Sequence, residues 1–387
     1  MTKTAPHLVT LVLLTALTVL TLNMFLPALP AMRAAFGVSE AVMGRAISLY
    51  MLAAAALQLI LGPLSDRFGR RPVILGLLAV YVFASVLCLT AQSVTLFLIA
   101  RTLQAVAVGG GILGSAVVRD LYEGRTAAAK LSLIASAMAI APMLAPMLGG
   151  LLETAFGWRS VFVTYAVLGA GLLLWCLRDL GETHTAGRMQ KMQLGGLIRS
   201  RVFWSYVSVQ AFGVGTFYIF LTGAPFVAAD VFALEPAEIG IALGTTTAGF
   251  MLGAGLSARL VERFGPMRLI LVGRVVPLIG LGATLAYYAS GGGLVIPLFL
   301  GTVTVGLGNG LSLANAIAGA LSVRPDLAGS ASGLNGAVSL SIGAGLSWMT
   351  TAVLSQSATP EALLLLMLGV VGVALCAAVA AARWDRD

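Results

Sequence analysis

Only 10% of the residues in the whole chain are charged. Two short stretches nevertheless combine an acid with several arginines. The first, GPLSDRFGRRP, covers 62–72, and the second, ARLVERFGPMR, covers 258–268 and has Glu262 where the first has Asp66. An acid beside arginines can form ion pairs, and it can also hydrogen-bond a helix N-terminus. Because Gly69 permits a tight bend, the pattern predicts an ionic corner that is built twice.

The first corner could act as a latch between parts of the molecule that move. Asp66 would hold one arrangement through an arginine at a neighbouring helix end and release it in another. Its candidate partners are Arg119 and the helix start near 328–329. In the alternative the arginines only anchor the chain at a membrane surface, but an anchor needs neither Asp nor Gly, so we favour the latch. The predicted gating residues of this corner are Gly62, Asp66, Arg67, Gly69, Arg70, Arg71 and Arg119.

Two arginines, Arg101 and Arg274, lie inside long apolar segments. An unpaired cation in the middle of a membrane helix costs about 2.5 kcal/mol or more. Gln104 follows Arg101 by three residues and therefore shares its helix face. Arg101 could extend to the membrane surface, or it could act beside a proton site or the path of a substrate. We favour the functional role.

Polar and aromatic side chains inside the apolar segments are candidates for binding an amphiphilic compound. Such a compound needs an apolar, aromatic wall with a few polar groups, and a methionine can make that wall adaptable. Any single aromatic residue could equally face lipid or fill a gap, whereas an amide inside the membrane must find partners. The predicted substrate-binding residues are Asn23, Tyr50, Gln58, Arg101, Gln104, Met138, Gln210, Phe217, Tyr218, Asn309, Asn315 and Asn335.

Other kinds of chemistry find little support. Cys88, Cys176 and Cys376 all lie in apolar runs and are expected to be small buried hydrophobes, and His7 and His184 show no ligand spacing. No phosphate-binding GxxxxGK[ST] loop is present, which disfavours ATP-driven transport. A membrane-embedded enzyme or receptor would need a cluster of nucleophiles, metal ligands or a soluble domain. We therefore expect neither an enzyme nor a metal or cofactor site.

The composition requires elements that lie in lipid. Of the 387 residues, 59% are hydrophobic and the mean hydropathy is +0.99, far above a soluble domain. A span needs about 20 mostly apolar residues and must be helical, because lipid offers no partners for backbone groups. We expect an all-α membrane protein with twelve transmembrane helices, at about 8–30, 43–62, 73–91, 95–118, 130–152, 159–178, 202–224, 237–258, 267–289, 294–316, 328–350 and 360–382.

The longest polar stretch, 178–201, divides these spans into six and six. The repeated corner lies between the second and third spans of each set, so the chain is a duplication of a six-helix unit. The expected domains are an N-terminal bundle (1–180), a cytoplasmic linker (181–201) and a C-terminal bundle (202–387).

The basic residues predict the orientation of the chain. Of the 23 Lys and Arg residues, only Arg33, Arg45 and Arg159 fall on the side opposite to the termini, while Arg101 and Arg274 lie within spans. Since cytoplasmic loops carry the excess of basic residues, both termini should be cytoplasmic. The net charge of +8 is spread over short loops, so it favours this orientation over binding of nucleic acid.

Three motifs resemble those of the major facilitator superfamily. The stretch 62–71 resembles the signature between its second and third helices, and RTLQ at 101–104, followed by glycines at 109–111, is similar to its fourth-helix motif. APMLAPMLGG at 141–150 resembles the antiporter motif of its drug-exporting branches. Prolines and glycines there would kink the helix and leave only small residues on one of its faces, so that another helix can pack closely. The alternative is a generic proline kink without a role in transport. The gating residues that this motif adds are Pro142, Pro146, Gly149 and Gly150.

NMFLPALP at 23–30 and VRDLY at 118–122 resemble the branch for bicyclomycin and chloramphenicol–florfenicol resistance. The resemblance implies a drug/proton antiporter with a central cavity between two pseudo-symmetric six-helix halves. It also implies a monomer in the bacterial inner membrane, with a small-molecule drug and protons as its partners.

One position departs from that branch. The branch usually has an Asp where this chain has Asn23, and a Tyr where it has Phe25. A carboxylate there would bind protons or cationic drugs, whereas an amide can only hydrogen-bond. All the acids lie in loops or at span ends, which leaves three explanations open: Asp120 or Glu153 lies deeper than it seems, coupling is weak, or Asn23 is a natural or engineered loss of charge. The proton-coupling candidates are Arg101 and Asp120.

The sequence thus favours an alternating-access exporter of small amphiphilic drugs or antibiotics, driven by proton entry. An exporter of an endogenous metabolite, such as a sugar or amino acid, with the same fold is the alternative. Growth protection against a panel of compounds would separate the two.

Overall fold

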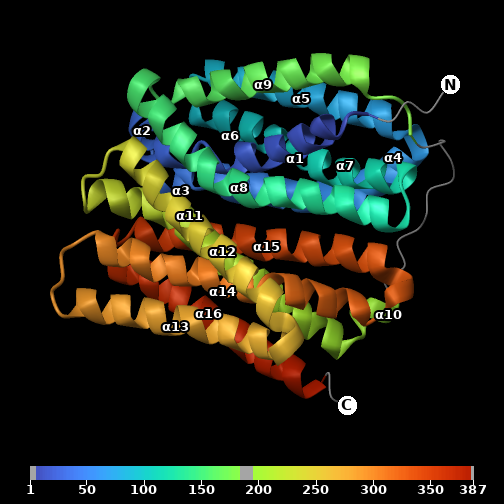
Figure 1. Cartoon of the computed structure of the whole chain (residues 1–387). Helices are drawn as coiled ribbons and strands as arrows, with labels where there is room; N and C mark the ends of the chain where they lie inside the picture. Colours follow the sequence, from blue (N-terminus) through green and yellow to red (C-terminus); the bar gives the residue numbers. More distant parts are fainter. Residues whose placement is uncertain (1–5, 184–194, 385–387) are drawn as a thin grey trace.

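The computed structural model describes residues 6–183 and 195–384, without the side chains at 128, 132 and 135–140, and its regular structure is helical throughout. Figure 1 shows the helices running roughly side by side. Their bounds are α1 Leu8–Asn23, η1 Leu26–Ala28, α2 Leu29–Phe36, α3 Glu40–Met43, α4 Arg45–Phe68, α5 Arg70–Thr90, α6 Val94–Leu103, η2 Gln104–Ala107, α7 Val108–Leu121, α8 Gly124–Phe156, α9 Arg159–Asp179, α10 Gly195–Ile198, α11 Arg201–Asp230, α12 Pro236–Phe264, α13 Pro266–Ala289, α14 Ile296–Ser322, η3 Pro325–Leu327, α15 Ala328–Leu354 and α16 Pro360–Trp384.

Membrane-spanning helices account for nearly the whole described chain. Within it, eleven helices or helix pairs are long and apolar enough to cross a membrane. The 33-residue helix α8 occupies the place of the remaining span and packs against α1 and α12. The all-α membrane fold expected from the sequence is confirmed, with most boundaries within a few residues of those predicted.

Two of the predicted spans are interrupted. The first helix stops at Asn23 and continues as η1 and α2, because Pro27 and Pro30 have no N–H to donate to the preceding turn. The fourth span contains the 3-10 turn η2 between α6 and α7. The Thr18 hydroxyl of α1 donates a 2.6 Å hydrogen bond to the Ala107 carbonyl of this turn. Both irregular segments are buried in protein, where such backbone is tolerated.

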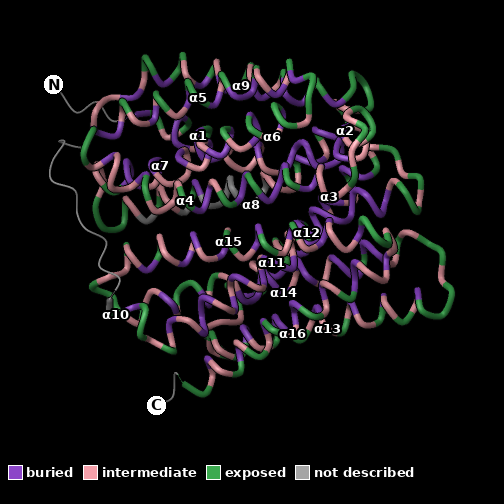
Figure 2. Tube along the Cα trace, turned by 180° about the vertical axis from the view of Figure 1, so that it is seen from behind, coloured by how far each residue is buried: buried purple, intermediate pink, exposed green. Residues whose placement is uncertain are grey.

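The helices form two groups (Figure 1). Helices α1 and α4–α9 pack against one another, as do α11–α16, while α8 with α12 and α4 with α15 make the main contacts between the groups. Both ends of the described chain lie at one end of the molecule, here called the terminal end, and α2 and α3 lie at the far end. In Figure 2 buried residues are dense along α11. In the most apolar 18-residue segment of this helix 78% of the residues are buried, against 33% in the corresponding segment of α9.

The apolar core shows where the groups meet. One continuous cluster of buried residues includes Tyr50 and Met51 from the first group and Ile219 and Leu354 from the second. A second, smaller cluster around Phe203 belongs to the second group alone and lies toward its terminal end. The hydrophobic cores of the two groups therefore merge only away from the terminal end.

Candidate transport site

Small residues let the two groups approach closely along α4 and α15. Glycine has no Cβ atom, and a Cβ added to Gly343 of α15 would collide with the Met51 side chain of α4. One added to Gly336 of α15 would collide with the side-chain amide of Gln58 on α4. On the other side of the boundary, a Cβ at Gly150 in α8 would collide with the Pro236 carbonyl of α12. Glycine thus lets side chains of α4 lie against the backbone of α15 and brings the backbones of α8 and α12 into contact, as is common between membrane helices.

An ion-pair network joins the groups at the far end. Arg33 of α2 donates to both carboxylate oxygens of Asp230, at the end of α11, over 2.7 and 2.9 Å. The same guanidinium pairs with Glu40, the first residue of α3. Together with the merged core, these pairs indicate that the boundary is closed at the far end in this structure.

A cluster of amides lies on the boundary nearer its middle. Asn335 of α15 donates a 2.6 Å hydrogen bond to the side-chain oxygen of Gln210 on α11, and the amide of Gln58 on α4 rests on the neighbouring Gly336. The side-chain oxygens of Asn335 and of Ser339, one turn away, are buried and have no hydrogen-bond partner among the described residues. We call Gln58, Gln210, Asn335 and Ser339 the amide cluster.

Aromatic side chains adjoin the amide cluster. A Cβ atom at Gly343 would meet the Tyr218 ring of α11 as well as Met51, so three helices converge there. Phe217 and Tyr218 have ring centroids 6.1 Å apart. Tyr50, the neighbour of Met51, is 3% exposed and its hydroxyl has no partner in the described part of the chain. One buried and two half-buried rings beside unpaired polar atoms form the kind of surface that binds an amphiphile.

Arg101 lies completely buried behind Tyr50. Its guanidinium donates to the Thr21 carbonyl at 2.6 Å and to the Gln104 side-chain oxygen at 2.9 Å. The guanidinium carbon lies 3.9 Å from the centre of the Phe25 ring and 4.6 Å from that of Tyr50, which is cation–π geometry. The alternative in which Arg101 extends to the membrane surface does not fit this position.

Neutral polar groups hold the partners of Arg101 in place. The Gln104 amide donates to the Ser85 hydroxyl at 2.8 Å. Tyr165 donates to backbone carbonyls of α1, including that of Thr21, whose hydroxyl lies 2.9 Å from that of Tyr81. The sequence analysis missed Ser85, Tyr81 and Tyr165, although each is a polar side chain inside an apolar segment, which is the signal that selected Asn23.

Asn23 ends α1 close to this arginine. Its amide nitrogen donates to the Val19 carbonyl at 2.8 Å, while its side-chain oxygen is buried without a partner among the described residues. Thr21 and Phe25, on either side of Asn23, both contact Arg101. The position where the resembling branch carries an acid therefore lies within one helical turn of two residues that contact the buried cation.

Two of the predicted binding residues lie elsewhere. Asn309 of α14 accepts a 2.9 Å hydrogen bond from the buried Arg274 and donates to the Gly213 carbonyl of α11. Asn315 donates to the Ser257 hydroxyl of α12 at 3.0 Å. Both amides tie together helices of the second group, so the structure gives them packing partners away from the amide cluster. Met138 lies in α8, but its side chain is outside the described residues.

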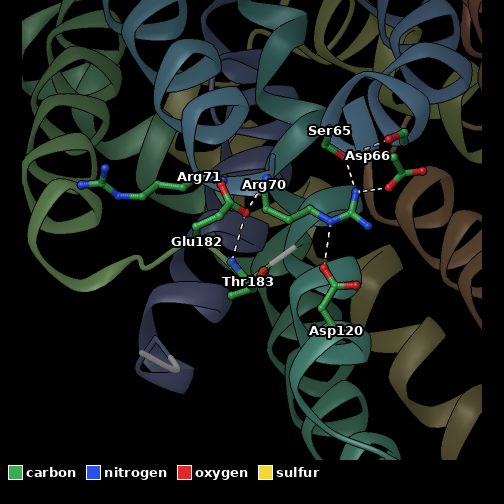
Figure 3. Close-up of polar contacts among 8 residues, drawn as sticks. Ser65, Asp66, Arg70, Arg71, Asp120, Glu182 and Thr183 are labelled. Carbon is green, nitrogen blue, oxygen red and sulfur yellow. Dashed lines mark hydrogen bonds and ion pairs between the residues drawn. The ribbon is translucent and has the colours of Figure 1, made fainter. Parts of the chain in front are cut away.

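The ionic corner is more extensive than the sequence indicated (Figure 3). Arg70 pairs with Asp66 at 2.6 Å and with Asp120 of α7 at 2.9 Å, and it also contacts Ser65. Arg119 is exposed. The arginine that contacts Asp66 is therefore Arg70 and not Arg119, because Arg70 begins the next helix one turn away.

An unexpected carboxylate completes the corner. Glu182, which follows α9, accepts hydrogen bonds from the backbone N–H groups of Arg70 and Arg71 at 2.9 and 3.2 Å, as seen in Figure 3. It therefore caps the N-terminus of α5. Arg71 in turn donates to the Leu180 carbonyl at 2.7 Å. Asp120 lies in this corner at the terminal end and not deep in the membrane.

The remaining predicted gating residues lie on α4 and α8. Gly62 and Arg67 lie within α4, and the Arg67 guanidinium covers the Phe68 ring at 5.1 Å. Pro142 and Pro146 lie inside the continuous helix α8. A Cβ at Gly149 would collide with the Met24 carbonyl, so this glycine lets α8 pack against the break after α1.

Membrane helices packed as two groups, with buried polar groups on the boundary between them, are the architecture of a secondary transporter. The model of the Major Facilitator Superfamily matches residues 11–347. The chain belongs to this superfamily. It is thus a multi-pass membrane transporter of small molecules and not an enzyme.

Relatives and solved structures agree with this assignment. The chain is 30% identical over 317 residues to the multidrug resistance protein MdtL of Shigella dysenteriae and to that of Escherichia coli O139:H28, covering 81% of each chain. Its fold is similar to an inward-facing, occupied bacterial homologue of the human lysosomal transporter Spinster (TM-score 0.80, 18% identity, 98% and 96% of the chains covered). It is also similar to the partially occluded, inward-open xylose transporter XylE of E. coli (TM-score 0.71, 13% identity, 96% of both chains).

Proposed function

We propose that this protein exports small amphiphilic drugs or antibiotics, of the phenicol or bicyclomycin type, by alternating access. The amide cluster beside Tyr218 and Tyr50 carries the proposal, since it offers buried unpaired oxygens and aromatic rings at the boundary between the groups. The similarity to proteins named for multidrug resistance gives independent support. The sequence resemblance to the branch for phenicol and bicyclomycin resistance supplies the compound class.

The moving bodies in this proposal are a bundle formed by 1–180 and another formed by 202–387, joined by the linker 181–201. With the termini on the cytoplasmic side of a bacterial inner membrane, the closed far end faces the periplasm. A monomer contains both bundles and therefore suffices for transport. Export requires the Arg33–Asp230 pair to break while the boundary closes at the terminal end.

Proton coupling has a candidate place in the ionic corner. Asp66 and Asp120 share Arg70. Protonation of Asp120 would remove one ion pair and weaken the attachment of the corner to α7. Asn23 cannot carry a proton, so entry of protons would act at the corner and not at the amide cluster.

A test of the function uses bacteria lacking their own exporters. Expression of the wild-type protein should protect growth against chloramphenicol, florfenicol or bicyclomycin, and Asn335→Ala should abolish most of that protection, because it removes the centre of the amide cluster. Cys376→Ser, an exposed position on α16, serves as the control. No protection against any of these compounds, together with accumulation of a metabolite in a knockout, would favour the metabolite exporter.

The coupling mechanism needs a separate measurement. Addition of a transported drug to proteoliposomes should move protons, and Asp120→Asn should reduce this movement. Asn23→Asp should raise the dependence of transport on the proton gradient if the site lacks only its acid. An unchanged pH profile in that variant would place coupling elsewhere.

A further inference from the structure

The membrane-embedded part of the protein contains fixed positive charge without negative charge. Arg101 and Arg274 are 0% and 1% exposed, and both lie in the middle of the bundle. Each of the thirteen acidic residues in the described part of the chain lies outside the helices or close to a helix end, as Asp66, Asp120 and Glu153 do. The middle of the bundle therefore carries buried cations that no carboxylate neutralises.

The buried Arg101 lies next to the boundary between the groups. One layer of side chains, the rings of Tyr50 and Phe25, covers its guanidinium, and Tyr50 belongs to α4, which packs against α15 of the other group. The hydrogen bonds of Arg101 go to neutral oxygens of Thr21 and Gln104, which stabilise the cation but leave its net charge in place.

Arg274 is equally buried but belongs to the interior of the second group. Its partners are the Gly308 carbonyl, Asn309 and Ser312, all on α14. Helix α13, which carries it, packs against α12, α14 and α16 and has no substantial contact with the first group. Its guanidinium also lies against Gly213 of α11, one helical turn from Gln210 of the amide cluster, so the charge of Arg274 adds to that of Arg101 near the proposed substrate site.

Four uncharged polar atoms among the described residues are buried and unpaired near the boundary. They are the side-chain oxygens of Asn23, Asn335 and Ser339 and the hydroxyl of Tyr50, all at most 7% exposed. The hydroxyls can donate to an anionic or neutral substrate, whereas the amide oxygens can only accept, for example from a neutral substrate. None of the side chains described at the amide cluster is a carboxylate that could neutralise a cationic substrate, whereas Arg101 repels one through a medium of low dielectric constant.

From these positions we propose that the site between the two groups discriminates by charge: it takes uncharged or anionic amphiphiles and rejects organic cations. This inference rests on the proposed function and adds the class of compound that can enter. For unit charges separated by about 8 Å at an effective dielectric constant of about 20, repulsion weakens binding by at least about tenfold.

The test measures binding of three probes to the purified full-length protein: chloramphenicol (neutral), tetraphenylborate (anionic) and tetraphenylphosphonium (cationic). The two tetraphenyl ions have nearly the same shape, and ratios between variants cancel their unequal partition into detergent. The wild type should bind the anion or the neutral probe at least about tenfold more tightly than the cation. Asn23→Asp, which adds a negative charge within one helical turn of the Arg101 partners Thr21 and Phe25, should reduce this preference by about tenfold.

A matched pair of charge-removing variants supplies the control. Arg101→Gln should weaken the preference against the cation as Asn23→Asp does, whereas Arg268→Gln, which removes an exposed charge at the second corner, should leave it unchanged. Equal binding of anion and cation by the wild type would overturn the inference, as would an unchanged preference in Asn23→Asp or an equal effect of both arginine variants. Failure to bind any of the three probes would count against the proposed function itself, and with it against the inference.

Discussion

The two corners of this transporter are built from nearly the same residues and yet differ in structure. In each, a helix ends in Arg-Phe-Gly, with a glycine at positive φ, +94° at Gly69 and +79° at Gly265. In each, the arginine covers the next phenylalanine ring, at 5.1 Å for Arg67 and 5.4 Å for Arg263. The repeated sequence therefore specifies the same bend, with one glycine between two helices.

The surroundings of the bends are different. The first corner contains the buried Arg70 with its two carboxylate partners, and Glu182 caps the helix that follows. At the second corner Pro266 begins α13, where it has no N–H that needs a cap. Glu262 and Arg268 are exposed there. The ionic contacts of the first corner thus depend on Asp120 and Glu182, which lie outside the repeated motif.

The largest difference between the corners should come from their arginines. Arg70→Leu leaves two partly buried carboxylates facing each other, which should destabilise the protein by about 3 kcal/mol or more. Arg268→Leu at the exposed second corner should change stability by less than about 0.5 kcal/mol. Thermal unfolding in detergent measures both. Equal effects would mean that the ion pairs of the first corner do not stabilise the fold.

The glycines should show a smaller contrast. An alanine at either position is strained by roughly 1–2 kcal/mol, because φ is positive. At Gly69 the added methyl would also collide with the Glu182 carboxylate, whereas at Gly265 it would meet nothing within 4 Å. Gly69→Ala should therefore lower the unfolding temperature more than Gly265→Ala. A larger effect at Gly265 would contradict the described packing of Glu182.

The sequence predicted the fold well for physical reasons. Lipid requires about 20 apolar residues in a helix for every crossing, so hydropathy alone places most spans. The break after Asn23 was missed, although Pro27 and Pro30 were visible, because the apolar run continues through them. The turn at 104–107 is supported by a hydrogen bond from Thr18, 89 residues away, which local sequence does not reveal.

The candidate site was only partly predictable. Periodicity and polarity selected Gln58, Gln210 and Asn335, which the structure brings to one boundary. The same criteria selected Asn309, which binds Arg274 inside the second group. An amide inside a span indicates that a hydrogen-bond partner must be present. Which helix supplies that partner depends on packing between distant segments, which the local sequence does not show.

Removing only the cap of the first corner should have a moderate effect. Glu182→Gln keeps the size of the side chain but replaces charge-assisted hydrogen bonds to two N–H groups with weaker neutral ones, at a cost of about 1 kcal/mol. Glu262→Gln, the matched change at an exposed position of the second corner, should be nearly neutral. Unfolding temperatures compare them, and a neutral Glu182→Gln would show that α5 does not need this cap.

The smallest expected effect belongs to the proline of the second corner. Pro266→Ala restores an N–H at the start of α13, but this group lies in the first turn, where no backbone partner exists in any helix. The unfolded chain gains conformational freedom, so stability should fall by about 0.5 kcal/mol, while transport stays at the wild-type level. A combined measurement of unfolding temperature and drug protection tests this. If Pro266→Ala instead impaired transport without changing stability, the second corner would take part in the conformational change, and the functional contrast between the corners would be wrong.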